Sequence, residues 1–181
     1  MDLKQHIIDG IIFKEGGYVN DSDDSGKEGK FGITKKRARA SGYFGSMIDL
    51  PRQFAFDIYQ KEYWDSVKGD DLLKISPDIA REVIDTGVNM GIGGAVKILQ
   101  RALNVLNNRG KLFDDIAVDG ALGPITLGVL SLYLDKRKYD GQTVLMRMLN
   151  SLQGAAYVEL AERREKDEKF IFGWFLNRVV L

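Results

Sequence analysis

Apolar residues recur at a helical spacing along most of the chain, and this pattern limits its fold more than any other feature. The first stripe predicts a helix that begins after Asp2 and ends at Gly16-Gly17. It consists of Leu3, Ile7, Ile8, Ile11 and Ile12. Similar stripes cover residues 79–88, 96–106 and 144–160, whereas sustained two-residue alternation is nearly absent. The pattern therefore predicts a mainly α protein.

The three prolines support this interpretation, because Pro51, Pro77 and Pro124 each stand where a helical stripe begins. One segment breaks the helical pattern: residues 18–34 are rich in Asp, Ser, Gly and Lys, which predicts an irregular or β-hairpin excursion. A change of composition near residues 107–120 suggests a second lobe. We therefore expect an N-terminal catalytic lobe over residues 1–75 and a helical C-terminal lobe over residues 76–181.

Composition excludes several classes of function. Among 181 residues, Lys plus Arg and Asp plus Glu both number 26, so the chain lacks the positive charge that contacts with nucleic acid require. There is no cysteine and only one histidine, His6, which lies off the apolar stripe and is expected at the surface. Thiol nucleophiles, Cys-based zinc sites and zinc sites with several imidazoles are therefore excluded. We expect carboxylate chemistry with no metal and no organic cofactor.

The segment around the first predicted helix end carries the strongest candidate for chemistry. Glu15 follows Ile11 by four positions and Ile12 by three, so it is expected to face inward at the last turn. Burial favours the protonated form of a carboxyl group, and a protonated carboxyl can act as a general acid. Gly16 and Gly17 follow it, and their lack of side chains would let a ligand approach the backbone.

The loop after Glu15 offers further oxygen-bearing side chains at Asn20, Asp21, Asp23 and Asp24. Glycoside hydrolysis commonly uses two carboxyl groups, one that protonates the leaving oxygen and one that activates water or stabilises charge on the sugar. Spacing along the sequence leaves both a retaining and an inverting outcome open, since the outcome depends on the distance between the two groups.

Residues 15–21 read Glu-Gly-Gly-Tyr-Val-Asn-Asp, and Gly32-Ile33-Thr34 follow after the acidic run. This stretch closely resembles the signature of the glycoside hydrolase family 108 N-acetylmuramidases, lysozyme-like enzymes of phages and bacteria. The resemblance continues through residues 85–91, and residues 99–103 and 118–126 are similar to a C-terminal peptidoglycan-binding region. It covers nearly the whole chain in the family's order.

The resemblance implies a two-lobed lysozyme-like fold and hydrolysis of the β-1,4 bond between N-acetylmuramic acid and N-acetylglucosamine. It implies Glu15 as the acid and makes Asp24 the leading candidate for its partner, because their spacing is similar to that in phage-type lysozymes. The family commonly has a Thr after the acidic run, where this chain has Gly29. Thr34, five positions later, is the candidate to replace it in positioning water.

Residues expected to contact the sugars come from three parts of the chain. They are Tyr18, Asn20, Asp21, Tyr59, Tyr63, Trp64 and Asn89. Aromatic side chains can stack on sugar rings, but at helical spacing they are more often part of the core, so only one or two are expected at the cleft. A buried amide at Asn89 would alternatively hydrogen-bond across the interface between the two lobes.

Other patterns allow alternatives. Asp21, Asp23, Ser25 and Gly26 match an EF-hand loop, but its twelfth position is Gly32 instead of Glu, which disfavours calcium. The basic run over residues 35–39 suits an anionic wall polymer or, more commonly, a solvated helix face. Asp119 and Gly120 suit peptide-stem recognition or a simple turn equally well.

The partner expected overall is a peptidoglycan glycan strand, bound by a protein that is a monomer and does not insert into a membrane. No signal peptide is evident, so we expect synthesis in the cytoplasm and action on the cell wall after holin-type or other release. Because the usual Thr is missing at Gly29, the alternative function is a weakly active or inactive wall-binding module with a regulatory or secretion-related role. A structural component of a phage is a third hypothesis.

Overall fold

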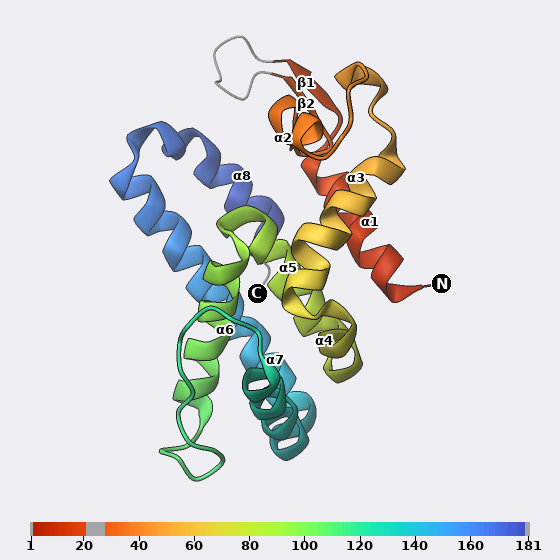
Figure 1. Cartoon of the computed structure of the whole chain (residues 1–181). Coiled ribbons are helices and arrows are strands. Elements are labelled where there is room, and N and C mark those ends of the chain that lie inside the picture. Colours follow the sequence, from red (N-terminus) through yellow and green to blue (C-terminus); the bar gives the residue numbers. More distant parts are fainter. Residues whose placement is uncertain (1, 21–27, 180–181) are drawn as a thin grey trace. The chain divides into compact units, whose positions relative to one another are not determined.

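The computed structural model describes residues 2–20 and 28–179, of which about 75% are helical. The chain forms two compact units, Met1–Ser66 and Val67–Leu181, with a small three-stranded antiparallel sheet in the first (Figure 1). This confirms the mainly α lysozyme-like fold and the β excursion. The catalytic lobe expected over residues 1–75 stays a prediction, because contacts alone do not define a catalytic lobe.

The first unit opens with helix α1, Leu3–Glu15, as the apolar stripe predicts. The Asp2 side chain caps it by accepting a hydrogen bond from the Lys4 backbone N–H at 3.0 Å. The buried residues of α1 are Ile7, Ile8, Ile11 and Ile12. The helix ends because Gly16 has a φ of 83°, a left-handed backbone that glycine adopts without steric cost.

Strands β1 (Tyr18–Asn20), β2 (Glu28–Lys30) and β3 (Ile33–Thr34) follow α1 and pair in that order. Phe31 and Gly32 alone join β2 to β3, and both have positive φ, 56° and 72°. Two positive φ values in a two-residue hairpin loop are the mark of a type I′ turn, whose twist matches that of the flanking strands. The β-hairpin therefore lies inside the excursion predicted over residues 18–34.

The rest of the first unit consists of short helices. They are α2 (Lys35–Ala40), η1 (Met47–Asp49), α3 (Arg52–Tyr59), η2 (Gln60–Trp64) and η3 (Asp65–Val67), which reaches the boundary of the units. Pro51 directly precedes α3, as predicted. Segment η2 is a π-helical turn, a rare form that occurs mostly as single turns inside α-helices and is frequent at functional sites.

The second unit is mainly helical and contains the three longest of the described helices (Figure 1). They are α4 (Gly69–Ile75), α5 (Pro77–Met90), α6 (Ile92–Leu106), α7 (Pro124–Arg163), η4 (Glu165–Asp167) and α8 (Glu168–Arg178). Helix α5 packs on α6 and α7, and α8 packs on α7. Pro77 and Pro124 occupy first turns, as predicted, and Lys138 interrupts α7 with a φ of 54°. None of the described helices combines the length and apolar character needed to cross a membrane.

The loop between α6 and α7 is held by amide side chains on one face of α6. Gln100 is 1% exposed and donates to Asp119 Oδ1 at 2.8 Å, while its Oε1 accepts from the Gly120 N–H at 2.9 Å. One helical turn later, Asn104 exchanges two hydrogen bonds with the backbone of Ile116. Asn107 follows and donates to Asp115 at 2.7 Å. These amide side chains hold in place a loop whose sequence has neither helical nor strand periodicity.

This arrangement favours the turn interpretation of Asp119 and Gly120. Hydrogen bonds from the Ala121 backbone N–H and from Gln100 lower the pKa of Asp119, so its carboxylate remains ionised as the acceptor. Gly120 has a φ of 80°, and a Cβ there would lie 2.9 Å from the Gly93 carbonyl oxygen. A side chain at position 120 is therefore excluded by both backbone conformation and space.

Replacing Gln100 by Leu is expected to lower the free energy of unfolding by about 2 kcal/mol, because a leucine of similar size leaves the Gly120 N–H and neighbouring buried groups without partners. Urea denaturation would measure the loss. Arg101→Leu, an exposed change on the same helix, is the control and should stay within about 0.5 kcal/mol of the parent. Equal losses in the two variants would contradict the role assigned to Gln100.

Candidate active site

The Glu15 side chain is half-buried at the C-terminal end of α1 and packs against the turn between β2 and β3. A Cβ placed on Gly32 would lie 2.8 Å from Glu15 Oε2 and 2.5 Å from the Tyr59 hydroxyl oxygen. Both oxygens therefore approach the same point above the Gly32 backbone, and any side chain at that position would displace them. The inward orientation expected for Glu15 agrees with this packing.

The residues that follow Glu15 leave space beside it. Gly16 and Gly17 are exposed, and no described atom lies within 4 Å of the position that a Cβ would take on either glycine. The Glu15 side chain therefore packs against Gly32 and Tyr59 on one side. Next to it lies the Gly16-Gly17 backbone, which no side chain of the described residues covers. A ligand can approach such backbone more closely than it could approach side chains.

The turn that supports Glu15 is itself unusual. A positive φ is uncommon for a residue as bulky as Phe31, and such conformations persist only where the surroundings enforce them. The Tyr59 hydroxyl provides one constraint by donating a hydrogen bond to the Phe31 carbonyl oxygen at 2.9 Å. The Lys30 ammonium, 5.0 Å from the centre of the Phe31 ring, covers its face. The buried Tyr59 thus links α3 to the turn beside Glu15.

Arg37, on α2, packs against the ring of Tyr59. Its guanidinium lies 5.8 Å from the Tyr59 ring and 5.2 Å from the Tyr63 ring, and the two rings stack with centroids 5.5 Å apart. Arg37 also forms an ion pair with Glu62 at 2.7 Å. Burial acts to lower the pKa of Arg37, but Tyr63 and Glu62 outweigh it and raise the pKa above its ordinary value. This cluster was not predicted from the sequence, because Arg37 and Tyr59 are too far apart along the chain for local periodicity to relate them.

The basic run over residues 35–39 is therefore mostly engaged within the protein. Lys35 pairs with Glu28 at 2.8 Å, Arg37 with Glu62, and Arg39 donates to the Tyr43 carbonyl oxygen at 2.6 Å. Lys36 is exposed. These contacts give the run a structural role, which neither of the two interpretations of the sequence included.

Tyr18 on β1 and Glu28 on β2 are diagonal neighbours across the strand pair. The exposed Tyr18 donates to Glu28 Oε1 at 3.2 Å, and the hydrogen bond from Lys35 lowers the pKa of Glu28. Desolvation and the neighbouring Glu28 raise the pKa of Tyr18, so its hydroxyl keeps its proton near neutral pH. Asn20, the cross-strand partner of Glu28, is exposed at the end of β1.

Thr34 lies directly across the sheet from Gly29. Opposite residues of an antiparallel pair present their side chains on the same face, roughly 4.5–5.5 Å apart. Thr34 is exposed, and its hydroxyl caps α2 by accepting from the Arg37 backbone N–H at 3.3 Å. Register thus brings Thr34 next to the position where the resemblance places a threonine, although the two are five residues apart in sequence.

The remaining predicted contact residues differ in their exposure. Trp64 is fully buried and Tyr59 is 2% exposed, which favours the core role for both rings, whereas Tyr63 is half-buried. Asn89 belongs to the second unit, where its side-chain amide lies against the guanidinium of Arg178, and Arg178 also pairs with the buried Asp85 at 3.4 Å. This contact lies within the second unit, so the alternative of an amide between the lobes stays a prediction. His6 is exposed, as predicted.

The acidic loop residues Asp21, Asp23 and Asp24, and with them most of the EF-hand match, lie outside the described residues. A cavity of about 500 Å³ in the first unit lies between α2 and α3 and includes Arg37 and Glu62, but not Glu15, in its lining. The roles expected for Glu15, Asp24, Thr34 and the contact residues stay predictions.

Comparison with known proteins gives the chain a family. A family model described as glycosyl hydrolase 108 matches residues 8–91, and a model described as predicted peptidoglycan domain matches residues 94–179. Among solved structures, the chain is similar to that of Brucella abortus SagA, with 22% identity, 94% of both chains covered and a TM-score of 0.61, which shows a shared fold. No curated protein matches.

The two family matches together span nearly the whole described chain and support peptidoglycan hydrolysis as its general activity. Residues 8–91 therefore belong to the glycosyl hydrolase 108 family, and residues 94–179 match a predicted peptidoglycan domain.

Proposed function

We propose that this protein is an N-acetylmuramidase that hydrolyses the β-1,4 bond between N-acetylmuramic acid and N-acetylglucosamine, with Glu15 as the general acid. The observation that supports this most directly is the setting of the Glu15 carboxyl. It is half-buried against Gly32 and Tyr59 and adjoins the bare backbone of Gly16 and Gly17. A carboxyl packed on one side, beside backbone that no side chain of the described residues covers, is suited to donate a proton to a bound glycosidic oxygen.

In this mechanism the Glu15 proton passes to the bridging oxygen as the bond from that oxygen to the muramic acid C1 breaks. Water adds its oxygen to C1 and loses a proton to a carboxylate, so the products are two shorter strands. Asp24 is the proposed partner, with Asp21 or Asp23 as substitutes. Thr34 is proposed to position water, because it lies opposite Gly29 on the same face of the sheet.

The proposal also includes where the protein acts and in what oligomeric state. The protein would act as a monomer on a peptidoglycan strand in the cell wall, after holin-type or other release from the cytoplasm. Tyr18, Asn20 and Tyr63 are the proposed contacts in the first unit that retain exposed surface. The reaction as written uses carboxyl groups and water.

Product analysis tests the assignment of the bond. Purified peptidoglycan digested with the protein and then reduced with borohydride should yield new reduced ends that are N-acetylmuramic acid, as shown by mass spectrometry. Reduced N-acetylglucosamine ends would contradict the proposal, because they show cleavage of the other glycosidic bond. Ends that are 1,6-anhydro sugars would also contradict it, because they show that water was not the nucleophile.

One observation favours the alternative of a wall-binding module with little or no activity. Gly29 provides no hydroxyl, and a Cβ at that position would lie 3.1 Å from the Ile33 carbonyl oxygen, so the sheet fits glycine most closely. The same digestion separates the two functions. Retention of the protein on the insoluble wall without release of any new ends would support the alternative.

A further inference from the structure

Tyr59 lies between the core of the first unit and the turn that supports Glu15. It is the last residue of α3, directly before the π-helical turn η2, and it is 2% exposed. Its hydroxyl donates a hydrogen bond to the Phe31 carbonyl oxygen at 2.9 Å. A Cβ on Gly32, the next residue, would lie 2.5 Å from this hydroxyl oxygen, 2.8 Å from Glu15 Oε2 and 3.0 Å from Glu15 Cβ. The Glu15 side chain therefore lies along the turn that Tyr59 contacts.

The conformation of this turn requires support from its surroundings. A two-residue turn with positive φ at both positions favours Asn, Asp or Gly, whereas here the first position is Phe31, with a φ of 56°. Such a backbone persists only where other contacts enforce it. The hydrogen bond from Tyr59 is one of these contacts. Without it, the Phe31 peptide is expected to rotate, and the Gly32 backbone would move with respect to Glu15.

The ring of Tyr59 is itself fixed by its neighbours. It stacks on the Tyr63 ring, with centroids 5.5 Å apart and an angle of 28° between the planes. The Arg37 guanidinium lies 5.8 Å from its centre and is held in place by the ion pair with Glu62 at 2.7 Å. A side chain whose rotamer is set by packing can place its polar atom accurately. The Tyr59 hydroxyl is therefore a well-defined point of attachment for the turn.

Burial decides how Tyr59 can influence chemistry. A side chain that is 2% exposed has no surface on which a sugar ring could stack, so a direct contact with substrate is excluded for this ring. An effect on the reaction must then pass through the turn. General acids depend strongly on position, since a displacement of about 1 Å can lower a rate by about 100-fold. The turn beside Glu15 is thus a place where a distant hydroxyl can change the rate.

We propose that Tyr59 is a positioning residue for Glu15: its hydroxyl fixes the Phe31 carbonyl, and the fixed turn keeps the Gly32 backbone under the carboxyl group. The inference rests on the proposed function for the role of Glu15 as the general acid. It extends that function to a core residue that does not touch the substrate.

Tyr59→Phe tests the proposal, because it removes the hydroxyl and keeps the ring that stacks on Tyr63. We expect kcat for peptidoglycan hydrolysis to fall about tenfold, the effect of losing one hydrogen bond between buried groups. The apparent KM should stay unchanged, since the ring does not contact the substrate. Release of soluble muropeptides, measured over a range of wall concentrations, separates the two constants. A variant that keeps more than half of the parent kcat would overturn the proposal.

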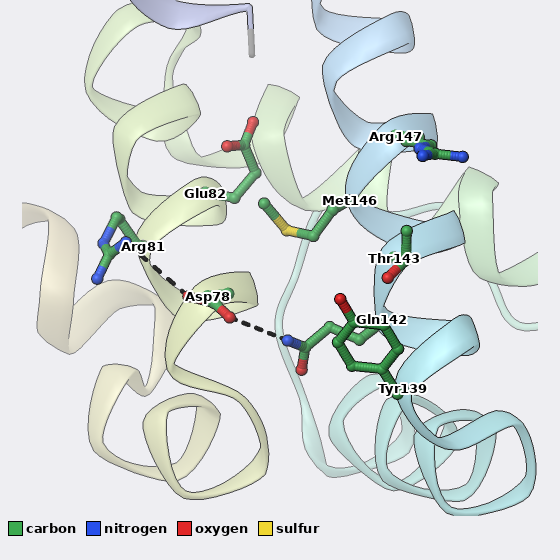
Figure 2. A pocket seen from close by; sticks show the side chains of 8 residues that line it. All are labelled: Asp78, Arg81, Glu82, Tyr139, Gln142, Thr143, Met146 and Arg147. Carbon is green, nitrogen blue, oxygen red and sulfur yellow. Dashed lines mark hydrogen bonds and ion pairs between the residues drawn. The ribbon is translucent and has the colours of Figure 1, made fainter. Parts of the chain in front are cut away.

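Two other tyrosines serve as matched controls. The Tyr43 hydroxyl also donates to a backbone carbonyl oxygen in the first unit, that of Ser46, at 2.8 Å. Tyr139 lies on α7 in the second unit and is 80% exposed (Figure 2). Tyr43→Phe and Tyr139→Phe should each keep kcat within about twofold of the parent. Thermal unfolding shows that every variant is folded, and equal losses in Tyr43→Phe and Tyr59→Phe would contradict a specific role for Tyr59.

A double-mutant cycle shows whether Tyr59 acts through Glu15. In the Glu15→Gln background, Tyr59→Phe should cause no further loss of rate, because the group that it positions has already been removed. If the two losses multiply instead, Tyr59 does not act through Glu15, and the proposal is wrong.

The ¹³C resonance of the Glu15 side-chain carboxyl provides a measurement that needs no turnover. Tyr59→Phe should shift this resonance, whereas Tyr43→Phe should leave it in place. An unchanged resonance in Tyr59→Phe would overturn the positioning role. Full activity of Glu15→Gln would instead remove the acid assignment, so the two failures are distinguishable.

Discussion

Glu15→Gln is expected to reduce the rate of peptidoglycan hydrolysis by at least about 100-fold, the lower bound for losing a general acid. The amide keeps the size of the side chain and its place against Gly32 but has no proton acidic enough to donate. Because the group acts on the transition state and not on ground-state binding, kcat should fall with little change in KM. Release of soluble muropeptides from purified walls, followed over time, measures the rate.

Asp49→Asn is the matched control for this experiment. It also neutralises one carboxylate in the first unit, and Asp49 is an exposed residue of η1. Its rate should stay within about twofold of the parent, as expected for a surface substitution. Retention of more than half of the parent rate by Glu15→Gln would remove Glu15 as the acid, whatever the products of the reaction are.

Gly32→Val is expected to lower the free energy of unfolding by about 3–4 kcal/mol and to abolish hydrolysis by the molecules that still fold. Two effects add. A β-branched residue at a φ of 72° costs about 1–2 kcal/mol, and overpacking adds about 1–3 kcal/mol. The overpacking arises because its Cβ would lie 2.5 Å from the Tyr59 hydroxyl and 2.8 Å from Glu15 Oε2. Urea denaturation and the wall assay, run on the same preparations, measure both.

Gly42→Val separates backbone strain from the clash. Gly42 has a φ of 93°, but no described atom lies within 4 Å of its Cβ position, so only the conformational cost of about 1–2 kcal/mol applies. Activity should be preserved in this variant. If both valine variants lose equal stability and both remain active, the close packing of Gly32 against Glu15 and Tyr59 is not what holds the candidate acid in place.

Much of the local structure could be predicted from the sequence. The isoleucine stripe, the Asp2 cap and Gly16 define α1, and the position of Glu15 on that stripe predicts its inward orientation. Pro77 and Pro124 mark helix starts for a purely local reason, since proline has no N–H to lose at the first turn. Signals of this kind act between residues at most four positions apart.

Tertiary structure decided which of the candidate groups meet. The sequence does not reveal that Tyr59 reaches the Phe31 carbonyl, that Thr34 lies opposite Gly29, or that Gln100 clamps the loop near Asp119. Periodicity predicts that a side chain turns inward but not what it will contact, because the partner is set by packing and strand register between distant segments. Trp64 is an example. Its helical spacing is also the spacing expected of an aromatic residue at a cleft, and yet its side chain is fully buried.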